Sequence, residues 1–294
     1  MLKNNRVQEF FSVKFRRLLS GDPQGVPPWL ETIGKGDTGG LFEPDDAPWV
    51  VHRDFGTLVG GVRALLMQAL HPGSLAGVAQ HSRYEQDALG RLSGTIRWLT
   101  VTTFGSFEAV AGEASRVNRL HERVKGEYVK KSETVSYKAA DPDLLLWVHL
   151  AFTESFLVAH NTFSENPVDA DEYVEKWGRS ATPLGLSKTP KSFAELEKAM
   201  AEFDCLRADD LTKRVVSFIQ NPPLPRSVKP VYKLLFAAAV ISLDDRYREI
   251  LGLKKPSLIV IPATRLLLRS IRTLIGPESP IEQAALDRLD RIAK

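Results

Sequence analysis

The sequence predicts an all-α fold built as a single domain. Apolar residues recur at helical spacing in one segment after another, strand-like alternation never extends beyond a few residues, and no internal repeat is present. Proline or glycine separates the helical segments, but no linker divides the chain of 294 residues. We therefore expect one helical domain over residues 1–294 with a single large core.

Composition and charge narrow the function classes. Hydrophobic residues make up 43% of the chain and charged residues 26%, which is ordinary for a soluble globular protein. The net charge is only +3 and basic residues are scattered, which argues against a nucleic-acid partner. One cysteine cannot form an internal disulfide, and the charged start Met1-Leu2-Lys3 leads into no apolar segment. We expect no secretory signal and a reducing, cytoplasmic setting.

Proline and glycine mark the boundaries of the N-terminal helices. Gly21-Asp22-Pro23 ends the first helix, and the Pro- and Gly-rich stretch 21–48 predicts a long loop with one short helix inside it. A later helix ends before Pro72, and residues 87–92 predict a polar turn. The helices predicted in this half span about 7–19, 58–70, 93–104 and 107–125.

The C-terminal half continues the helical pattern after a loop expected to reach Ala140. Its longest apolar run, Leu234 to Leu243, is too short to cross a bilayer. The helices predicted here span about 141–160, 170–178, 193–206, 212–219, 231–243, 262–275 and 280–293.

The helix predicted from Asp141 is the centre of the fold. Asp141 suits an N-cap, Pro142 suits the first helical position, and the following turns are apolar on nearly every side. His149 lies within this apolar run. Burying an imidazole without a partner costs about 1–3 kcal/mol, so its nitrogens must meet a hydrogen-bond partner or a metal.

Several common chemistries are excluded by spacing. His121-Glu122 begins like a zinc-protease helix, but Lys125 stands where the second histidine ligand is needed. The chain lacks the paired Glu-x-x-His motifs of di-iron bundles and the glycine-rich motifs of nucleotide-binding proteins and α/β-hydrolases. Cys205 lies among acids, which weaken it as a nucleophile and favour a structural role. Without C-x-x-C-H, any haem would be held non-covalently.

Two further histidines and two arginines have plain structural interpretations. His71 can cap the last carbonyls of the helix before Pro72, and His81 suits a polar turn or the rim of a pocket. Arg116 and Arg119, one turn apart, form a solvated face unless their helix borders a cavity.

Five segments occur in a specific order along the chain. They are Gly60–Pro72, Ala76–Ser82, Gly90-Arg91-Leu92, Arg116-x-x-Arg119-Leu120-His121 and Leu144–His149. Together they resemble the MpaB/latex-clearing-protein (rubber oxygenase) family over roughly residues 40–255, which leaves the C-terminal helices of residues 256–294 outside. The resemblance implies an all-helical, globin-like fold and, from the rubber-cleaving members, a b-type haem dioxygenase that cuts carbon–carbon double bonds.

The resemblance assigns roles to individual residues. His149 resembles the proximal ligand of the haem iron. Arg116 and Arg119 resemble a distal pair in which the second member is a lysine, and a guanidinium is a poor iron ligand. The family's threonine is replaced by Leu120, and its catalytic glutamate has no counterpart, since Thr100 and Val101 occupy that region. These departures argue against rubber-type cleavage.

We therefore expect a haem b-dependent oxygenase that uses iron and dioxygen to act on an apolar, isoprenoid- or lipid-like small molecule. The candidate catalytic residues are Arg116, Arg119 and His121, which would hydrogen-bond negative charge developing on oxygen. His149 is the candidate metal ligand. The candidate cofactor-binding residues are His149, His71, His81 and Arg63.

Two other function classes stay open. One is a non-catalytic haem or hydrophobic-ligand binding protein, which the replaced distal residues favour. The other is a peripheral membrane protein, because Arg265, Arg269 and Arg272 recur along one face of a leucine-rich helix. A packed helix with a solvated basic face is the commoner reason for this pattern.

Overall fold

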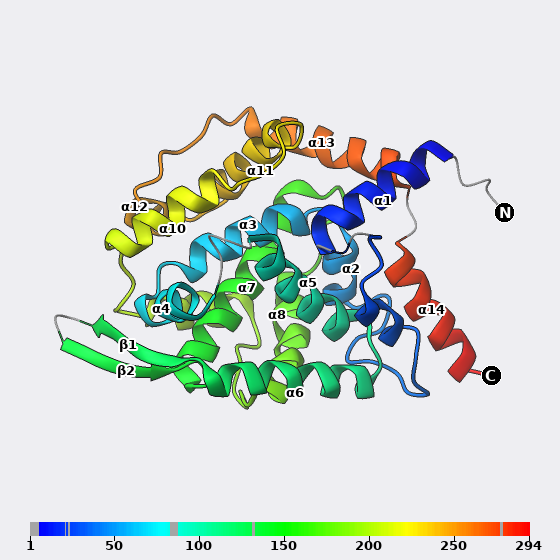
Figure 1. Ribbon diagram of the computed structural model, residues 1–294, viewed down its shortest axis with the longest axis horizontal. Coiled ribbons are helices and arrows are strands. Elements are labelled where there is room, and N and C mark those ends of the chain that lie inside the picture. The colour runs from blue at the N-terminus through cyan, green and yellow to red at the C-terminus, as the bar shows by residue number, and fades with distance from the viewer. Residues whose placement is uncertain (1–5, 21, 23, 83–87, 131–132, 277–278) are drawn as a thin grey trace.

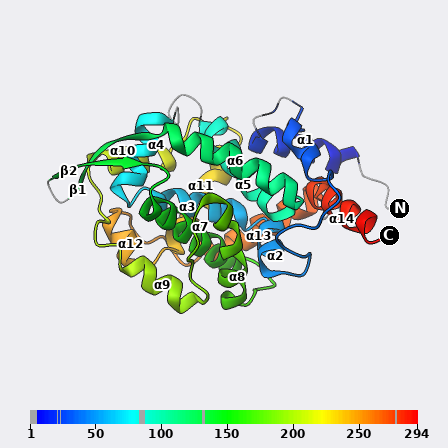
Figure 2. The same ribbon diagram turned by 90° about the horizontal axis from the view of Figure 1, so that it is seen from below.

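A computed structural model describes residues 6–20, 22, 24–82, 88–130, 133–276 and 279–294. Helices surround the long central helix α7, and one two-stranded hairpin projects at the end opposite the termini (Figures 1 and 2). The α-helices before the hairpin are α1 (Arg6–Ser20), α2 (Ala47–Arg53), α3 (Thr57–Gln68), α4 (Pro72–His81), α5 (Ala88–Phe104) and α6 (Phe107–Arg123). The predicted all-α class is confirmed.

The second half of the chain contains the central helix and the helices that cover it. The α-helices are α7 (Pro142–Phe163), α8 (Ala170–Trp177), α9 (Phe193–Ala201), α10 (Asp210–Gln220), α11 (Lys229–Ile241), α12 (Asp245–Ile250), α13 (Val260–Ile275) and α14 (Pro280–Ile292). Short 3-10 turns are η1 (Pro28–Thr32), η2 (Gly178–Ser180) and η3 (Thr182–Leu184). The hairpin strands are β1 (Lys125–Lys130) and β2 (Glu133–Lys138).

The structure corrects four sequence expectations. The region predicted as a loop up to Ala140 contains the antiparallel hairpin β1–β2, with Tyr128 opposite Val135. Helix α5 begins at Ala88, within the predicted turn 87–92, whose first residue lies outside the described residues. Residues 72–81 form α4, and α9 ends at Ala201 rather than Leu206. Helices α4 and α5 form where local turn residues suggested interruption, because packing overrides weak local preference, whereas α9 is shorter than predicted.

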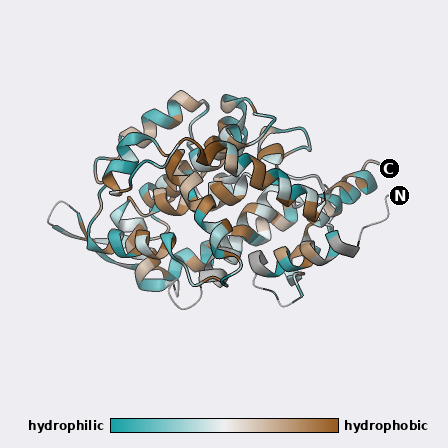
Figure 3. Cartoon of the chain, turned by 90° about the horizontal axis from the view of Figure 1, so that it is seen from above, coloured by the Kyte–Doolittle hydropathy of each residue, from teal (hydrophilic) through white to brown (hydrophobic). Residues whose placement is uncertain are grey.

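Helix α7 lies at the centre because it is apolar on most sides. It contacts α3 along its length and also α2, α4, α8, α9 and α13. Helices α3 and α7 pack closely at Gly60, where an added Cβ would lie 2.6 Å from Phe156 Cδ1. One continuous cluster of buried apolar side chains joins both halves of the chain, from Ile33 to Ala285. Figure 3 shows hydrophobic residues gathered on the central helices and hydrophilic ones on the outer helices.

Among the described helices, α7 is long and apolar enough by length and composition to cross a membrane. However, 56% of the most apolar stretch of this helix is buried inside the molecule. The core helix of a globular protein has the same properties, so length and composition alone do not assign a membrane span to α7.

The exposed arginines of helix α13 have polar partners in other segments of the protein. Arg265 Nη2 donates to the carbonyl of Thr162 at 2.7 Å. Arg269 pairs with Glu165 and Arg272 pairs with Asp54, so all three arginines have partners across the chain. All three side chains are nevertheless exposed, and the peripheral-membrane alternative stays a prediction.

Candidate functional site

A cavity of about 420 Å³ lies between α4, α5, α6 and α7, beside the base of the hairpin. Gln68 at the end of α3, Tyr137 of β2 and the segment from Trp177 to Leu186 complete its wall. Most of the lining is apolar, with a few polar side chains. Small-molecule and cofactor sites typically have volumes of about 300–1,000 Å³ and this kind of lining.

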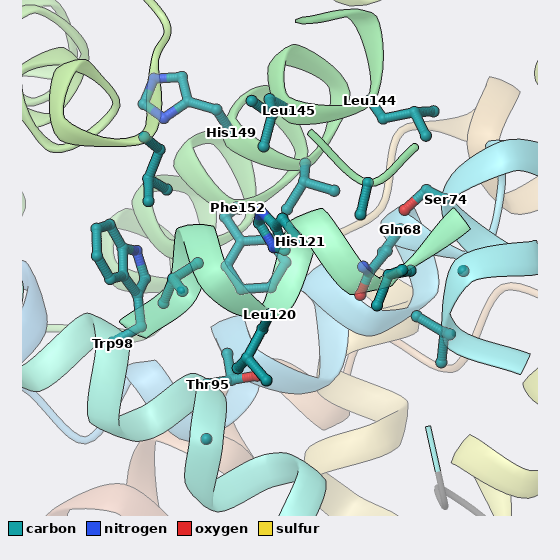
Figure 4. A pocket seen from close by; sticks show the side chains of 18 of the residues that line it. Gln68, Ser74, Thr95, Trp98, Leu120, His121, Leu144, Leu145, His149 and Phe152 are labelled. Carbon is teal, nitrogen blue, oxygen red and sulfur yellow. The ribbon is translucent and has the colours of Figure 1, made fainter. Parts of the chain in front are cut away.

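Helix α7 contributes His149 to the wall of the cavity. Leu145, His149 and Phe152 are three or four residues apart, so they share one face of the helix, and all three line the cavity (Figure 4). The opposite face buries Trp147 in the core. The long apolar helix therefore places one imidazole on the side where the packing leaves space.

The environment of His149 keeps its imidazole neutral. Burial lowers the pKa of His149 to about 4, because the apolar surroundings disfavour the charged ring. Within the described residues the ring forms no hydrogen bond, although its backbone carbonyl accepts one from Thr153 Oγ1 at 2.7 Å. A neutral imidazole without a protein partner can bind a metal or a hydrogen-bonding ligand in the cavity.

Helix α6 supplies the facing wall. Ser106 caps its start by accepting a hydrogen bond from the Ala109 N–H at 3.2 Å. Arg116 and His121 both line the cavity, and Leu120 lies between them in sequence on the same wall. Arg119 is exposed and is not part of the lining, so the structure separates the two arginines that the sequence had paired.

Glu113 is a buried acid that the sequence analysis did not single out. Its side chain is only 1% exposed and accepts hydrogen bonds from Arg97 Nε at 2.7 Å and from Arg116 Nε at 2.9 Å. The sequence contains a hint, since Glu113 precedes Arg116 by three residues, a spacing that favours ion pairs on a helix. Its burial beneath Arg97 could not be read from that spacing.

His71 has a capping role in the structure. Its Nδ1 accepts hydrogen bonds from the N–H groups of Gly73 at 3.2 Å and Ser74 at 3.3 Å. The cap is therefore at the start of α4 and not at the carbonyl end of the preceding helix, because Pro72 begins a new helix. Burial lowers the pKa of His71 to about 4. His71 does not line the cavity, and its cofactor-binding role stays a prediction.

The two remaining cofactor candidates lie in different places. His81 lines the cavity at the last residue of α4, and its Nε2 lies 2.9 Å from the carbonyl oxygen of Lys125. Arg63 is outside the lining, where it is fully buried and forms a bidentate ion pair with Glu154. Arg63 Nη2 also donates to the Ser242 carbonyl at 3.0 Å. A cofactor-binding role stays a prediction for both residues.

Several side chains that form the cavity wall were not predicted from the sequence. Trp98 of α5 and Trp177 of α8 form part of its wall, while Gln68 and Ser74 add polar groups. These residues come from distant parts of the chain and carry no shared motif, so only the fold brings them together.

Comparison with protein families identifies one match. The sequence model described as "ER-bound oxygenase mpaB/B'/Rubber oxygenase, catalytic domain" matches residues 49–276, which is more than three quarters of the chain. Comparison with curated proteins and with solved structures gave no match. The matched region contains every cavity-lining residue, from Gln68 to Leu186.

Proposed function

The chain belongs to the mpaB/B' and rubber oxygenase family, and we propose that it is a b-type haem-dependent oxygenase that acts with dioxygen on an apolar, isoprenoid- or lipid-like molecule. The observation that carries this proposal is His149. Its neutral imidazole faces a cavity of about 420 Å³ and has no hydrogen-bond partner among the described residues. The family itself supports the oxygenase class, whereas haem and the substrate class are our proposal.

The donor set fits a porphyrin better than a bare metal ion. Within the described residues, no group of three His, Cys, Asp or Glu side chains could hold a metal. A single imidazole suits a metal that brings its own equatorial ligands, and haem iron is commonly held by one proximal histidine. When bound, haem supplies the one-electron and dioxygen chemistry that side chains lack.

Arg116 is the residue best placed to stabilise developing charge. Its Nε and Nη2 donate to Glu113, whereas Nη1 forms no hydrogen bond within the described residues. A guanidinium that is already fixed by one carboxylate needs little reorganisation before it stabilises negative charge on an oxygen of the reacting species. His121 lines the same wall and can assist. Arg119 is exposed, and its catalytic role stays a prediction.

An absorption spectrum tests the proposal. We expect the purified protein, given haem, to show a Soret band that is lost or shifted in His149→Ala. The matched control is His160→Gln, which changes a second buried histidine of α7 outside the cavity lining and should leave the band unchanged. Wild-type protein that takes up no haem would contradict the proposal.

A haem or hydrophobic-ligand carrier without catalytic activity is the second candidate. The exposed position of Arg119 and the presence of Leu120 in the cavity wall favour it, because no distal lysine is present to take part in chemistry. Turnover with ¹⁸O-labelled dioxygen separates the two candidates. Label incorporated into an alkene substrate supports the oxygenase, and bound but unchanged alkene supports the carrier.

We also propose a cytoplasmic location with peripheral membrane contact. Leu258 and Ile259, before α13, are each 70% exposed, and they follow the exposed residues Lys254 and Lys255. Apolar side chains beside lysines suit the anionic inner surface of a membrane. Flotation with phosphatidylserine vesicles should be reduced by Leu258→Ser with Ile259→Ser. Arg269→Gln should have little effect, since Arg269 already pairs with Glu165.

A further inference from the structure

Two polar side chains in the cavity wall, Gln68 and Ser74, have no side-chain hydrogen-bond partner among the described residues. Gln68 is 8% exposed and Ser74 is 7% exposed, and both line the cavity. Ser74 Oγ is buried without a hydrogen bond, and the Gln68 amide forms none within the described part of the chain. Figure 4 shows both residues on the side of the cavity opposite His149, with the Gln68 amide directed toward its middle.

An unpaired polar group in an apolar wall is costly. Leaving a buried donor or acceptor without a partner costs about 1–3 kcal/mol, so such groups usually meet a ligand or a water. A glutamine amide and a serine hydroxyl can each donate and accept a hydrogen bond. The pair therefore matches a ligand group that offers both functions, or an oxygen that accepts from both.

The charge of the surroundings indicates a neutral ligand group. Gln68 and Ser74 are uncharged, and the neighbouring His71 is kept neutral by burial, which lowers its pKa to about 4. Among the described residues, Arg116 is the one guanidinium in the cavity wall, and its Nε and Nη2 are already held by Glu113. A carboxylate held by Gln68 and Ser74 would be desolvated without a free cation, which is strongly unfavourable.

We propose that Gln68 and Ser74 bind the polar end of the substrate, and that the substrate is a neutral oxygenated isoprenoid or lipid, an alcohol or a carbonyl compound. A plain hydrocarbon would leave both side chains unpaired, and a fatty acid would bury a charge. This inference rests on the proposed function only in treating the cavity as a substrate site. It does not depend on haem binding.

Binding of three compounds with one carbon skeleton tests the inference. The probes are farnesol, the hydrocarbon farnesene and the carboxylate of farnesoic acid, titrated into the purified protein. Titration calorimetry gives the affinities, and quenching of Trp98 and Trp177 in the cavity wall reports occupancy. We expect farnesol to bind at least tenfold more tightly than farnesene, which corresponds to about 1.4 kcal/mol. Farnesoate should bind no more tightly than farnesene.

Conservative variants identify the side chains responsible. Gln68→Met and Ser74→Ala should each weaken farnesol binding about five- to tenfold and change farnesene binding less than twofold. The matched controls are Gln220→Met and Ser270→Ala, which make the same chemical changes at exposed positions outside the cavity. Circular dichroism and urea unfolding confirm that each variant is folded.

Three outcomes would overturn the inference. They are equal affinity for farnesol and farnesene, farnesol binding that both cavity variants leave unchanged, and no binding of any of the three compounds. The second outcome is expected if Gln68 and Ser74 hold a water instead. The haem proposal fails separately, because its readout is the Soret band of wild type and His149→Ala. A protein without haem that still prefers farnesol would retain the inference and lose the proposed cofactor.

Discussion

Glu113 and Arg116, one helical turn apart on α6, form a bidentate ion pair in which Arg116 Nε and Nη2 both donate to the carboxylate. The same carboxylate also accepts from Arg97 on α5, at 2.7 Å. One buried negative charge therefore fixes two guanidinium groups and joins two helices of the cavity wall. The position of Arg116 depends on this carboxylate as much as on its own helix.

Removing the charge of Glu113 should destabilise the protein. We expect Glu113→Gln to lower the free energy of unfolding by about 3 kcal/mol, because it leaves two guanidinium groups without their counter-charge in a partly buried site. Urea denaturation measures the change. Glu122→Gln, at an exposed position of the same helix, should stay within about 0.5 kcal/mol of wild type. Equal effects of the two variants would show that the ion pair contributes nothing.

His71 makes stability depend on pH. Its pKa is about 4 in the folded protein against an ordinary value of 6.5, so the unfolded state binds more protons between those pH values. The contribution of neutral His71 to the free energy of unfolding is therefore fully present above about pH 6.5. It is lost as the pH is lowered toward 4.

His71→Asn separates this titration from the cap, since an asparagine side chain can still accept from the backbone at a helix start. The variant should be less stable than wild type at pH 7.5, because the smaller side chain packs less well against Trp147 and Phe203. Between pH 7 and pH 5, however, it should lose on the order of 1–2 kcal/mol less than wild type. Urea unfolding at both pH values measures the difference, and identical losses would contradict the assigned cause.

The central helix shows what local sequence can predict. The run from Pro142 predicted a buried helix, and α7 extends from Pro142 to Phe163. Asp141 ends up differently from the prediction, because its side chain accepts from the Lys138 N–H at 2.8 Å and does not cap α7. That detail depends on the hairpin, which the sequence analysis missed because few of its residues are apolar. Tyr128 and Tyr137 pack together and against neighbouring helices, and the Tyr137 hydroxyl donates to Gln80 Oε1 at 3.0 Å.

The candidate site was predicted in part for similar reasons. His149 stood out because it lies in an apolar helix, and Arg116 because its position resembles the distal arginine of the family. Both line one cavity with His121. The partners of Arg63 could not be predicted, since Glu154 is 91 residues away and its contact exists only after α3 and α7 have packed. The exposure of each arginine on α6 could not be predicted either. Arg116 and Arg119 are one turn apart, yet Arg116 lines the cavity and Arg119 is exposed to solvent.

Arg63 and Glu154 should behave as a coupled buried pair. Arg63→Met should cost about 3–5 kcal/mol, because Glu154 would then carry a buried charge without a partner. Replacing both residues by methionine removes both charges and should recover most of this loss. A urea-based double-mutant cycle measures the coupling.

The same double variant tests the predicted cofactor role of Arg63. Since Arg63 lies outside the cavity lining, we expect the double variant to take up haem as wild type does. Loss of the Soret band in a folded double variant would show that Arg63 contributes to cofactor binding.

Gly60 and Gly61 provide a matched test of how closely α3 approaches α7. A Cβ at Gly60 would lie 2.6 Å from Phe156 Cδ1 and 3.2 Å from Phe156 Cα, whereas a Cβ at Gly61 would meet no other atom within 4 Å. Gly60→Ala should therefore separate the two helices and lower stability by about 1–3 kcal/mol. Gly61→Ala should raise stability by about 0.5–1 kcal/mol, because alanine favours the helix over glycine. Both values come from urea unfolding of neighbouring variants that differ only in what surrounds the new methyl group. Equal changes in stability would mean that α3 and α7 do not meet at Gly60, and the central packing described for α7 would be wrong.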